Sequence, residues 1–267
     1  PTPPRSSFMS KSNAAVDALV KAQTHELRLP TVGNRFGDLA DQAGRDGVPH
    51  RDYLANLFEL ELDDRSQRRA ERRLQEAHFP HRKRLEDFSF EQSSVSATLL
   101  HQLAKGEYLA RAENVIFIGD SGTGKSHLAT GLGIAACHQG RRVRFTTVAA
   151  LVTELQESQD AHQLGRAVRR YSGIELLILD ELGYVQSSET GAELLFQVLA
   201  ERNEAASIIV TTNLPFGEWT RIFTDARLCK AVVDRLTFGA HIVETGTDSW
   251  RLKTSLARAR KPDKGSK

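Results

Sequence analysis

The chain of 267 residues has few of the features that mark secreted, zinc-bound or membrane proteins. Its two cysteines, Cys137 and Cys229, are too few for a disulfide framework or a four-cysteine zinc site. With 8 prolines, 7% aromatic and 26% charged residues, it is neither collagen-like nor wholly disordered. No run approaches the roughly 18 apolar residues that a membrane span requires. We therefore predict a globular protein of the reducing cytoplasm.

The two ends differ in composition from the rest. Residues 1–8 are rich in Pro and Ser and precede the only methionine, Met9, which we interpret as the natural start behind a leader or added segment. The formal net charge is +2, yet the last 17 residues hold 7 Lys and Arg against 1 Asp. Such a tail can bind nucleic acid by counterion release or simply be solvated. We predict a leader or disordered segment at 1–11 and a basic tail at 257–267.

Residues 12–80 are predicted to form a small all-helical domain. The apolar residues that follow helical spacing are Val16, Leu19, Val20, Leu54, Leu57 and Phe58. Pro49 suits the first turn of the later helix, and Phe79-Pro80 ends it because proline cannot continue the hydrogen-bond ladder.

Residues 81–256 show a different pattern, in which short apolar runs alternate with helical segments. The predicted strands are residues 114–118, 143–146, 176–179, 208–211 and 241–244. Apolar pairs such as Leu128 with Leu132 and Leu151 with Leu155 lie in the helices between them. This alternation predicts an α/β fold with a five-stranded parallel sheet between helices.

Residues 119–126, with the sequence GDSGTGKS, match the phosphate-binding P-loop pattern between a predicted strand and a helix. Glycines let the loop amides wrap around phosphate oxygens, and the helix N-terminus adds its positive end. The predicted nucleotide-binding residues are Gly119, Asp120, Ser121, Gly122, Thr123, Gly124, Lys125 and Ser126.

Catalytic and metal-binding candidates stand in and beyond this loop. Lys125 can reach the outer phosphates, and the Ser126 hydroxyl suits a Mg²⁺ ion. Asp180 and Glu181 follow a buried strand, at the edge where ligands collect in parallel sheets. We predict that Asp180 holds Mg²⁺, directly or through water, and that Glu181 polarises the water that attacks the terminal phosphate of ATP.

Further candidates are less specific. Asn213 ends another predicted strand and can orient the attacking water, although Asn at such a place is usually a turn residue. The transition state also requires positive charge, for which Arg235 and Arg251 are candidates and Arg227 is the reserve. Each of these arginines, taken alone, is more typical of a surface ion pair.

Arginines at intervals of three and four predict one basic stripe on a helix. They are Arg65, Arg68, Arg69, Arg72 and Arg73. The alternative is a solvated helix with ion pairs, because acidic residues flank the stripe. Further basic clusters comprise Arg82, Lys83, Arg84, Arg141, Arg142, Arg144, Arg166, Arg169 and Arg170. Since no helix-turn-helix or zinc-finger signature accompanies them, we expect contacts to the DNA backbone with little base reading.

The sequence resembles the IstB-like and DnaC-like branch of the AAA+ ATPases, and most closely the IstB helper ATPases of bacterial insertion sequences. The resemblance spans about residues 55 to 256. It rests on AHFP at 77–80, LEDFSF at 85–90, the P-loop with HLA after it, LDELGY at 179–184, LFQ at 195–197, TTNLPFGEW at 211–219 and DRL at 234–236. Two departures are Asp120, where the family often has proline, and Trp250, where it usually has tyrosine.

This resemblance implies a P-loop AAA+ core behind the helical N-terminal domain. It adds His127 to the nucleotide-binding residues, and it makes Asn213 the sensor-1 residue, Arg235 a finger offered to the adjacent subunit and Arg251 the sensor-2 arginine. It further implies ATP and Mg²⁺ as ligands, a homo-oligomer with active sites between subunits, and double-stranded DNA and a transposase as partners.

Three functions follow as hypotheses. The first is an ATP-hydrolysing regulator of transposition that assembles on DNA and activates a transposase. The second is a DnaC-like loader of a replicative helicase; zinc-containing loaders have cysteines in the N-terminal domain, and residues 1–95 have none. The third, a small-molecule kinase, is disfavoured because Asp180, Glu181 and Asn213 fit attack by water better than transfer to a substrate.

Overall fold

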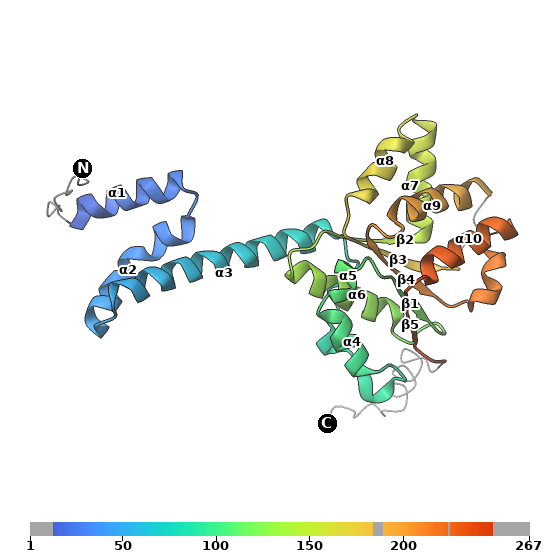
Figure 1. The fold of residues 1–267 in the computed structure, drawn as a ribbon, viewed down its shortest axis with the longest axis horizontal. Coiled ribbons are helices and arrows are strands. Elements are labelled where there is room, and N and C mark those ends of the chain that lie inside the picture. The colour runs from blue at the N-terminus through green and yellow to red at the C-terminus, as the bar shows by residue number, and fades with distance from the viewer. Residues whose placement is uncertain (1–12, 184–188, 224, 248–267) are drawn as a thin grey trace, which may run out of the picture. The chain divides into compact units, whose positions relative to one another are not determined.

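The computed structural model describes residues 13–183, 189–223 and 225–247 (Figure 1). Contacts divide the chain into two compact units, residues 1–69 and 70–267. The predicted leader at 1–11 and the predicted basic tail at 257–267 lie outside the described residues.

The first unit is all-helical in its described part, as the sequence predicts. Its helices are α1 (Asn13–Glu26), α2 (Pro30–Asp46) and the larger part of α3 (His50–Glu76). Its small core contains Val32, Phe36 and Leu57. Of the apolar residues with helical spacing on α3, Leu57 is buried, whereas Leu54 and Phe58 are 49% and 47% exposed. A unit this small cannot cover every apolar face of its helices.

A buried carboxylate joins α2 to α3. Helix α2 has no side-chain cap of its own, and Glu61 of α3 accepts hydrogen bonds from the backbone N–H groups of Thr31 and Val32 at 2.8 and 3.2 Å. Burial acts to raise the pKa of Glu61, but hydrogen bonds from Val32, Arg65 and Thr31 bring that pKa below its ordinary value. The carboxylate therefore satisfies the positive end of α2.

The second unit contains a five-stranded parallel sheet between two layers of helices. Its strands are β1 (Val115–Ile118), β2 (Val143–Thr147), β3 (Leu176–Leu182), β4 (Ser207–Thr212) and β5 (His241–Glu244). One face is covered by α4 (Ala97–Ala104), α5 (Glu107–Ala110) and α6 (Lys125–His138). The other is covered by α7 (Val148–Asp160), α8 (Leu164–Ser172), α9 (Glu189–Arg202), the 3-10 helix η3 (Phe216–Arg221) and α10 (Ala226–Thr237). Two further 3-10 turns, η1 (Leu85–Asp87) and η2 (Phe90–Gln92), precede α4.

The strand order β2-β3-β4-β1-β5 determines where a ligand can bind. Because all the pairings are parallel, the carboxyl ends of β3, β4 and β1 meet at one edge. This is the edge where open parallel sheets bind ligands. The five strands are confirmed. The ends of β1, β2 and β4 differ from the predicted ends by one residue, and β3 continues past its predicted end at Leu179 to Leu182, because its pairing with β4 resumes beyond Glu181.

The interior of the second unit contains Trp219 and both cysteines. Trp219 and Cys137 are fully buried, and burial raises the pKa of the Cys137 thiol to about 12. Cys229 is buried as well. A buried cation also lies here: Arg202 donates to the carbonyls of Tyr171 and Ser207, and burial lowers its pKa to about 10.

Replacement of Glu61 by glutamine tests the cap on α2. We expect Glu61→Gln to lower the free energy of opening of α2 by about 1–3 kcal/mol, because a buried charged acceptor of two N–H groups is lost. Hydrogen exchange of peptides from α2 measures this effect. Glu59→Gln, on the exposed surface of α3, is the matched control. Because the pKa of Glu61 is lowered in the folded chain, the difference in opening free energy is fully present above the ordinary carboxyl pKa and is lost as the pH falls through the lowered pKa. A difference that persists below the lowered pKa would contradict this origin.

Candidate nucleotide-binding and hydrolysis site

The P-loop connects β1 to α6 through backbone conformations that require glycine. Gly122 and Gly124 have φ values of +86° and +96°. A Cβ on Gly124 would also lie 2.5 Å from the ring of Phe88. The loop therefore combines left-handed backbone with close packing, and only glycine satisfies both.

Lys125, the first residue of α6, lies along this loop. Its ammonium donates to the carbonyl oxygens of Gly119 and Asp120 at 2.7 Å each. The side chain also lines the cavity described below, so the positive charge stands where the sequence predicts contact with the outer phosphates.

The predicted metal-binding residues come together although they are 54 positions apart in the chain. The Ser126 hydroxyl donates to Oδ1 of Asp180 at 2.8 Å. No cluster of three or more His, Cys, Asp or Glu side chains able to hold a metal ion exists within the described ranges. A hydroxyl and a carboxylate oxygen are the hard ligands that Mg²⁺ prefers, and this ion commonly takes its remaining ligands from phosphate and water.

Glu181 and Asn213 lie in the same cavity, as their positions at strand ends predict. Glu181 is exposed and has a left-handed backbone, with φ +65°. The side-chain oxygen of Asn213 is buried and has no hydrogen-bond partner among the described residues. Gly183, with φ +118°, passes so close to it that a Cβ there would lie 3.1 Å from that oxygen. Asn213 therefore has unused hydrogen-bonding capacity at the cavity.

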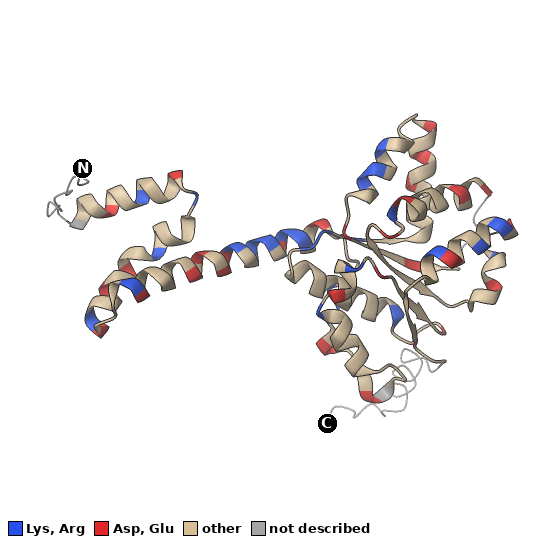
Figure 2. Ribbon diagram, in the orientation of Figure 1, with Lys and Arg blue, Asp and Glu red and all other residues tan. Residues whose placement is uncertain are grey.

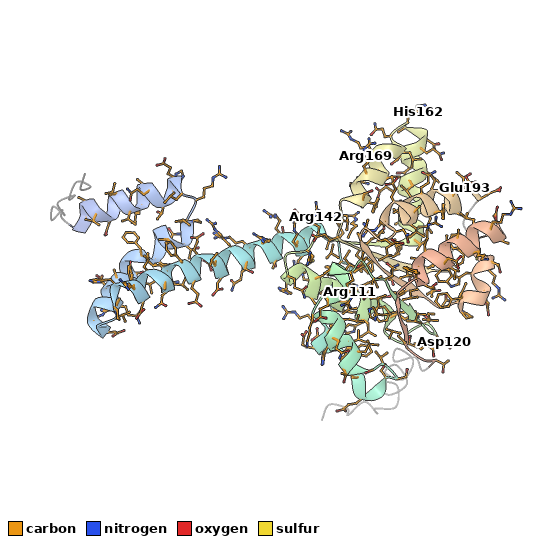
Figure 3. The ribbon with its side chains drawn as sticks, in the orientation of Figure 1. Arg111, Asp120, Arg142, His162, Arg169 and Glu193 are labelled. Carbon is orange, nitrogen blue, oxygen red and sulfur yellow. The ribbon has the colours of Figure 1, made fainter. Side chains whose placement is uncertain are left out.

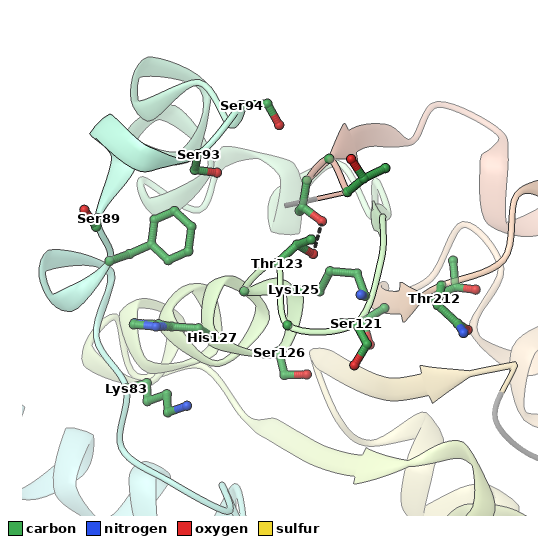
Figure 4. A pocket seen from close by; sticks show the side chains of 18 of the residues that line it. Lys83, Ser89, Ser93, Ser94, Ser121, Thr123, Lys125, Ser126, His127 and Thr212 are labelled. Carbon is green, nitrogen blue, oxygen red and sulfur yellow. Dashed lines mark hydrogen bonds between the residues drawn. The ribbon is translucent and has the colours of Figure 1, made fainter. Parts of the chain in front are cut away.

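The cavity has a volume of about 810 Å³ (Figure 4). Ser121 to His127 line one side, whereas Gly119 and Asp120 lie outside the lining and shape the loop. The wall opposite Thr212 comes from the segment before α4, where Figure 4 shows Ser89, Ser93 and Ser94. Lys83, which we placed in a basic cluster for DNA, also lines this cavity.

Contacts with two other segments of the chain hold the P-loop and helix α6 in place. Thr123 Oγ1 is 2.6 Å from Thr245 Oγ1, a hydrogen bond drawn in Figure 4. His127 Nε2 lies 2.7 Å from the carbonyl oxygen of Arg84, and its ring packs edge-on against Phe88. Sequence reasoning assigned no role to Phe88 or Thr245. The LEDFSF segment was a signal for Phe88, whereas nothing in the sequence singles out Thr245.

Comparison with known proteins identifies the family of this chain. The family model described as "IstB-like ATP binding protein" matches residues 22–258. The chain belongs to this IstB-like family. With the P-loop and the paired acids, it is an AAA+ ATPase.

Relatives in sequence support this family, and a solved structure has a similar fold. An insertion sequence ATP-binding protein of Sinorhizobium fredii is 38% identical, over 93% of this chain and 84% of that protein. One named for IS21, from Pseudomonas aeruginosa, is 35% identical over 85% and 86%. The structure of AMPPCP-bound DnaA from Aquifex aeolicus shares the fold, with a TM-score of 0.54 at 18% identity over 71% of this chain and 58% of that chain. No described helix of the IstB-like chain is long and apolar enough to cross a membrane.

Of the arginines predicted to complete the IstB-like site, the two that the structure describes, Arg227 and Arg235, are not among the residues that line the cavity. Arg235 does not line the cavity of its own chain; its guanidinium lies over the ring of Phe196, 4.8 Å from the centroid. Arg227 is exposed in the first turn of α10. Arg251, like Trp250, lies outside the described residues.

The arginines predicted to contact DNA mostly have acidic partners. Figure 2 shows that Lys and Arg gather on the C-terminal part of α3. Those with an acidic partner within 4.0 Å are Arg65, Arg68, Arg72, Arg73, Arg82, Arg141, Arg142 and Arg170. Arg69 and Arg169 form no ion pair with any residue that the structure describes, and Figure 3 shows Arg169 projecting from α8. The ion-paired alternative therefore describes most of these arginines.

Removal of the Lys125 ammonium tests the cavity as a nucleotide site. We expect Lys125→Ala to weaken ATP binding about 10- to 100-fold, because a charge-assisted hydrogen bond contributes about 1.5–3 kcal/mol. Titration with a fluorescent ATP analogue measures the dissociation constant. Lys105→Ala, which removes an exposed lysine at the end of α4, controls for loss of charge. Equal affinities of the two variants would show that nucleotide binds elsewhere.

Proposed function

We propose that this protein hydrolyses ATP to control a transposition reaction, assembling with ATP on double-stranded DNA and activating a partner transposase. One observation carries the chemical part: Ser126, Asp180, Glu181 and Asn213 lie together around the P-loop at the edge where β1, β3 and β4 end. The biological part is supported by relatives named for ATP binding and for insertion sequences.

Each residue has a distinct task in this proposal. The loop amides and Lys125 bind the phosphates, and Ser126 and Asp180 would hold Mg²⁺. The ion, when bound, neutralises charge on the phosphate oxygens. Glu181 accepts a proton from the attacking water, and Asn213, which lines the same cavity, orients that water.

The position of Arg235 supports the proposed oligomer. Its side chain packs on Phe196 and does not reach the cavity of its own chain. Phosphoryl transfer gains from an arginine at the developing charge, and a neighbouring subunit can supply it. We therefore assign Arg235 to the cavity of an adjacent protomer, with Arg227 as the alternative.

DNA contacts are assigned first to arginines without acidic partners. Among the described residues, Arg166 and Arg169 of α8 are exposed and form no ion pair, so they can contact phosphates without breaking one. A solved DnaA structure of similar fold, with a TM-score of 0.53, is described as bound to AMPPCP and single-stranded DNA. Binding through backbone charge would weaken steeply as salt concentration rises.

The Glu181→Gln variant tests the whole proposal. We expect ATP affinity close to that of the wild type and hydrolysis about 10²- to 10⁴-fold slower, because the general base is lost. With ATP and duplex DNA, the variant should accumulate a DNA-bound oligomer that dissociates as salt increases. Phosphate release, electron microscopy and a salt series measure these effects. Persistent hydrolysis would exclude Glu181 as the base, and absence of a DNA-bound oligomer would exclude the assembly.

A mixing experiment tests the shared active site. Arg235→Ala alone should lose hydrolysis about 10³-fold or more. Mixed with Glu181→Gln, it should regain activity, since an intact Arg235 then faces an intact cavity across the interface. Arg227→Ala is the comparison variant. If Arg227→Ala shows this complementation and Arg235→Ala does not, the reserve assignment is correct; hydrolysis by isolated monomers would exclude both.

A further inference from the structure

A β-bulge interrupts the pairing of β3 with β4 at the catalytic edge of the sheet. Leu179 pairs with Val210, and Leu182 pairs with Thr212. Two residues of β3, Asp180 and Glu181, therefore stand opposite the single residue Thr211 of β4. Bulges of this kind bend a strand and redirect its side chains, and they are frequent beside active sites.

The hydroxyl of Thr211 occupies the gap that the bulge creates. Thr211 Oγ1 accepts a hydrogen bond from the backbone N–H of Glu181 at 3.0 Å and donates one to Oδ1 of Asp180. A threonine hydroxyl has one hydrogen to donate and lone pairs to accept, so both bonds form at once. Thr211 is 1% exposed, and its bond to Asp180 is buried, whereas its bond from the N–H of Glu181 is partly buried.

The two bonds act on both acids of the site. The N–H bond fixes the backbone of Glu181 in the left-handed region, at φ +65°, which costs free energy for a residue that is not glycine. This conformation leaves the Glu181 side chain exposed at the cavity while its neighbours Asp180 and Leu182 stay buried. The second bond occupies Oδ1 of Asp180 together with the Ser126 hydroxyl, and no described residue donates to Oδ2.

We propose that Thr211 is a positioning residue for ATP hydrolysis: its hydroxyl holds the β-bulge that aims Glu181 into the cavity and orients Asp180 toward the cation. This assignment rests on the proposed function, in which Glu181 is the base and Asp180 a metal ligand. Thr211 lines the same cavity but is 1% exposed, and in this scheme it acts through the two acids. Without its hydroxyl, the partly buried N–H of Glu181 would lose its partner and the bulge would relax.

Two replacements at Thr211 distinguish the effect of its hydroxyl from the effect of its packing. Thr211→Val keeps the shape and removes both hydrogen bonds, and we expect a kcat lower by about 10- to 100-fold with an unchanged dissociation constant for ATP. It should also require more Mg²⁺ for half-maximal hydrolysis, since Asp180 loses its orientation. Thr211→Ser restores the hydroxyl and should return both values close to those of the wild type. Steady-state hydrolysis, nucleotide titration and a Mg²⁺ series measure the three quantities.

Matched variants make the outcome decisive. Thr146→Val changes a buried threonine on β2, the other neighbour of β3, and should leave kcat unaffected. In the Glu181→Gln background, Thr211→Val should lower the residual rate little further, because the group it aims is already missing. The proposal is overturned if Thr211→Ser is as slow as Thr211→Val, or if Thr211→Val changes ATP affinity and not kcat. Failure of the proposed function would look different: wild-type protein without hydrolysis, or Glu181→Gln with full hydrolysis.

Discussion

The parallel register of the central sheet is the constraint on which the rest of the site depends. With β1 paired between β4 and β5, and β3 on the far side of β4, the strands deliver their carboxyl ends to one edge. The P-loop leaves β1 there, the acidic pair leaves β3 and Asn213 follows β4. Segments that are distant in the chain thus share one cavity without a long loop to carry them. Apolar side chains fill both faces of the sheet and pack it between the two layers of helices.

Much of this arrangement can be predicted from the sequence, because its signals are local. Apolar runs of four or five residues between turns indicate buried parallel strands, and GDSGTGKS requires its loop wherever it follows one. Asp180 and Glu181 are identified by the same reasoning. The P-loop also predicts where its own helix starts, since Lys125 must begin α6 for the loop amides to point inward.

What the sequence could not provide depends on contacts between distant residues. The hydrogen bond between Thr123 and Thr245 joins positions 122 apart in the chain, and no sequence pattern around Thr245 indicates that it pairs with the P-loop. Helical spacing on α3 predicts a helix but not which apolar residues find a partner, so Leu57 is buried while Leu54 remains half exposed. Arginine spacing likewise predicts a stripe but not its pairing: Glu61, buried to cap α2, also binds Arg65 and Arg68. A carboxylate engaged with the backbone thus reduces the charge that the stripe presents.

The two cysteines allow a practical use of the molecule. Cys137 is fully buried in α6 with its thiol pKa raised to about 12, and Cys229 is 6% exposed in α10. Thiol reagents attack the thiolate of an accessible cysteine, so neither side chain reacts while the chain stays folded. The natural protein is therefore a silent background for site-directed labelling. A dye or spin label attached to one introduced surface cysteine would report on that position alone, and the native thiols would become reactive only on unfolding.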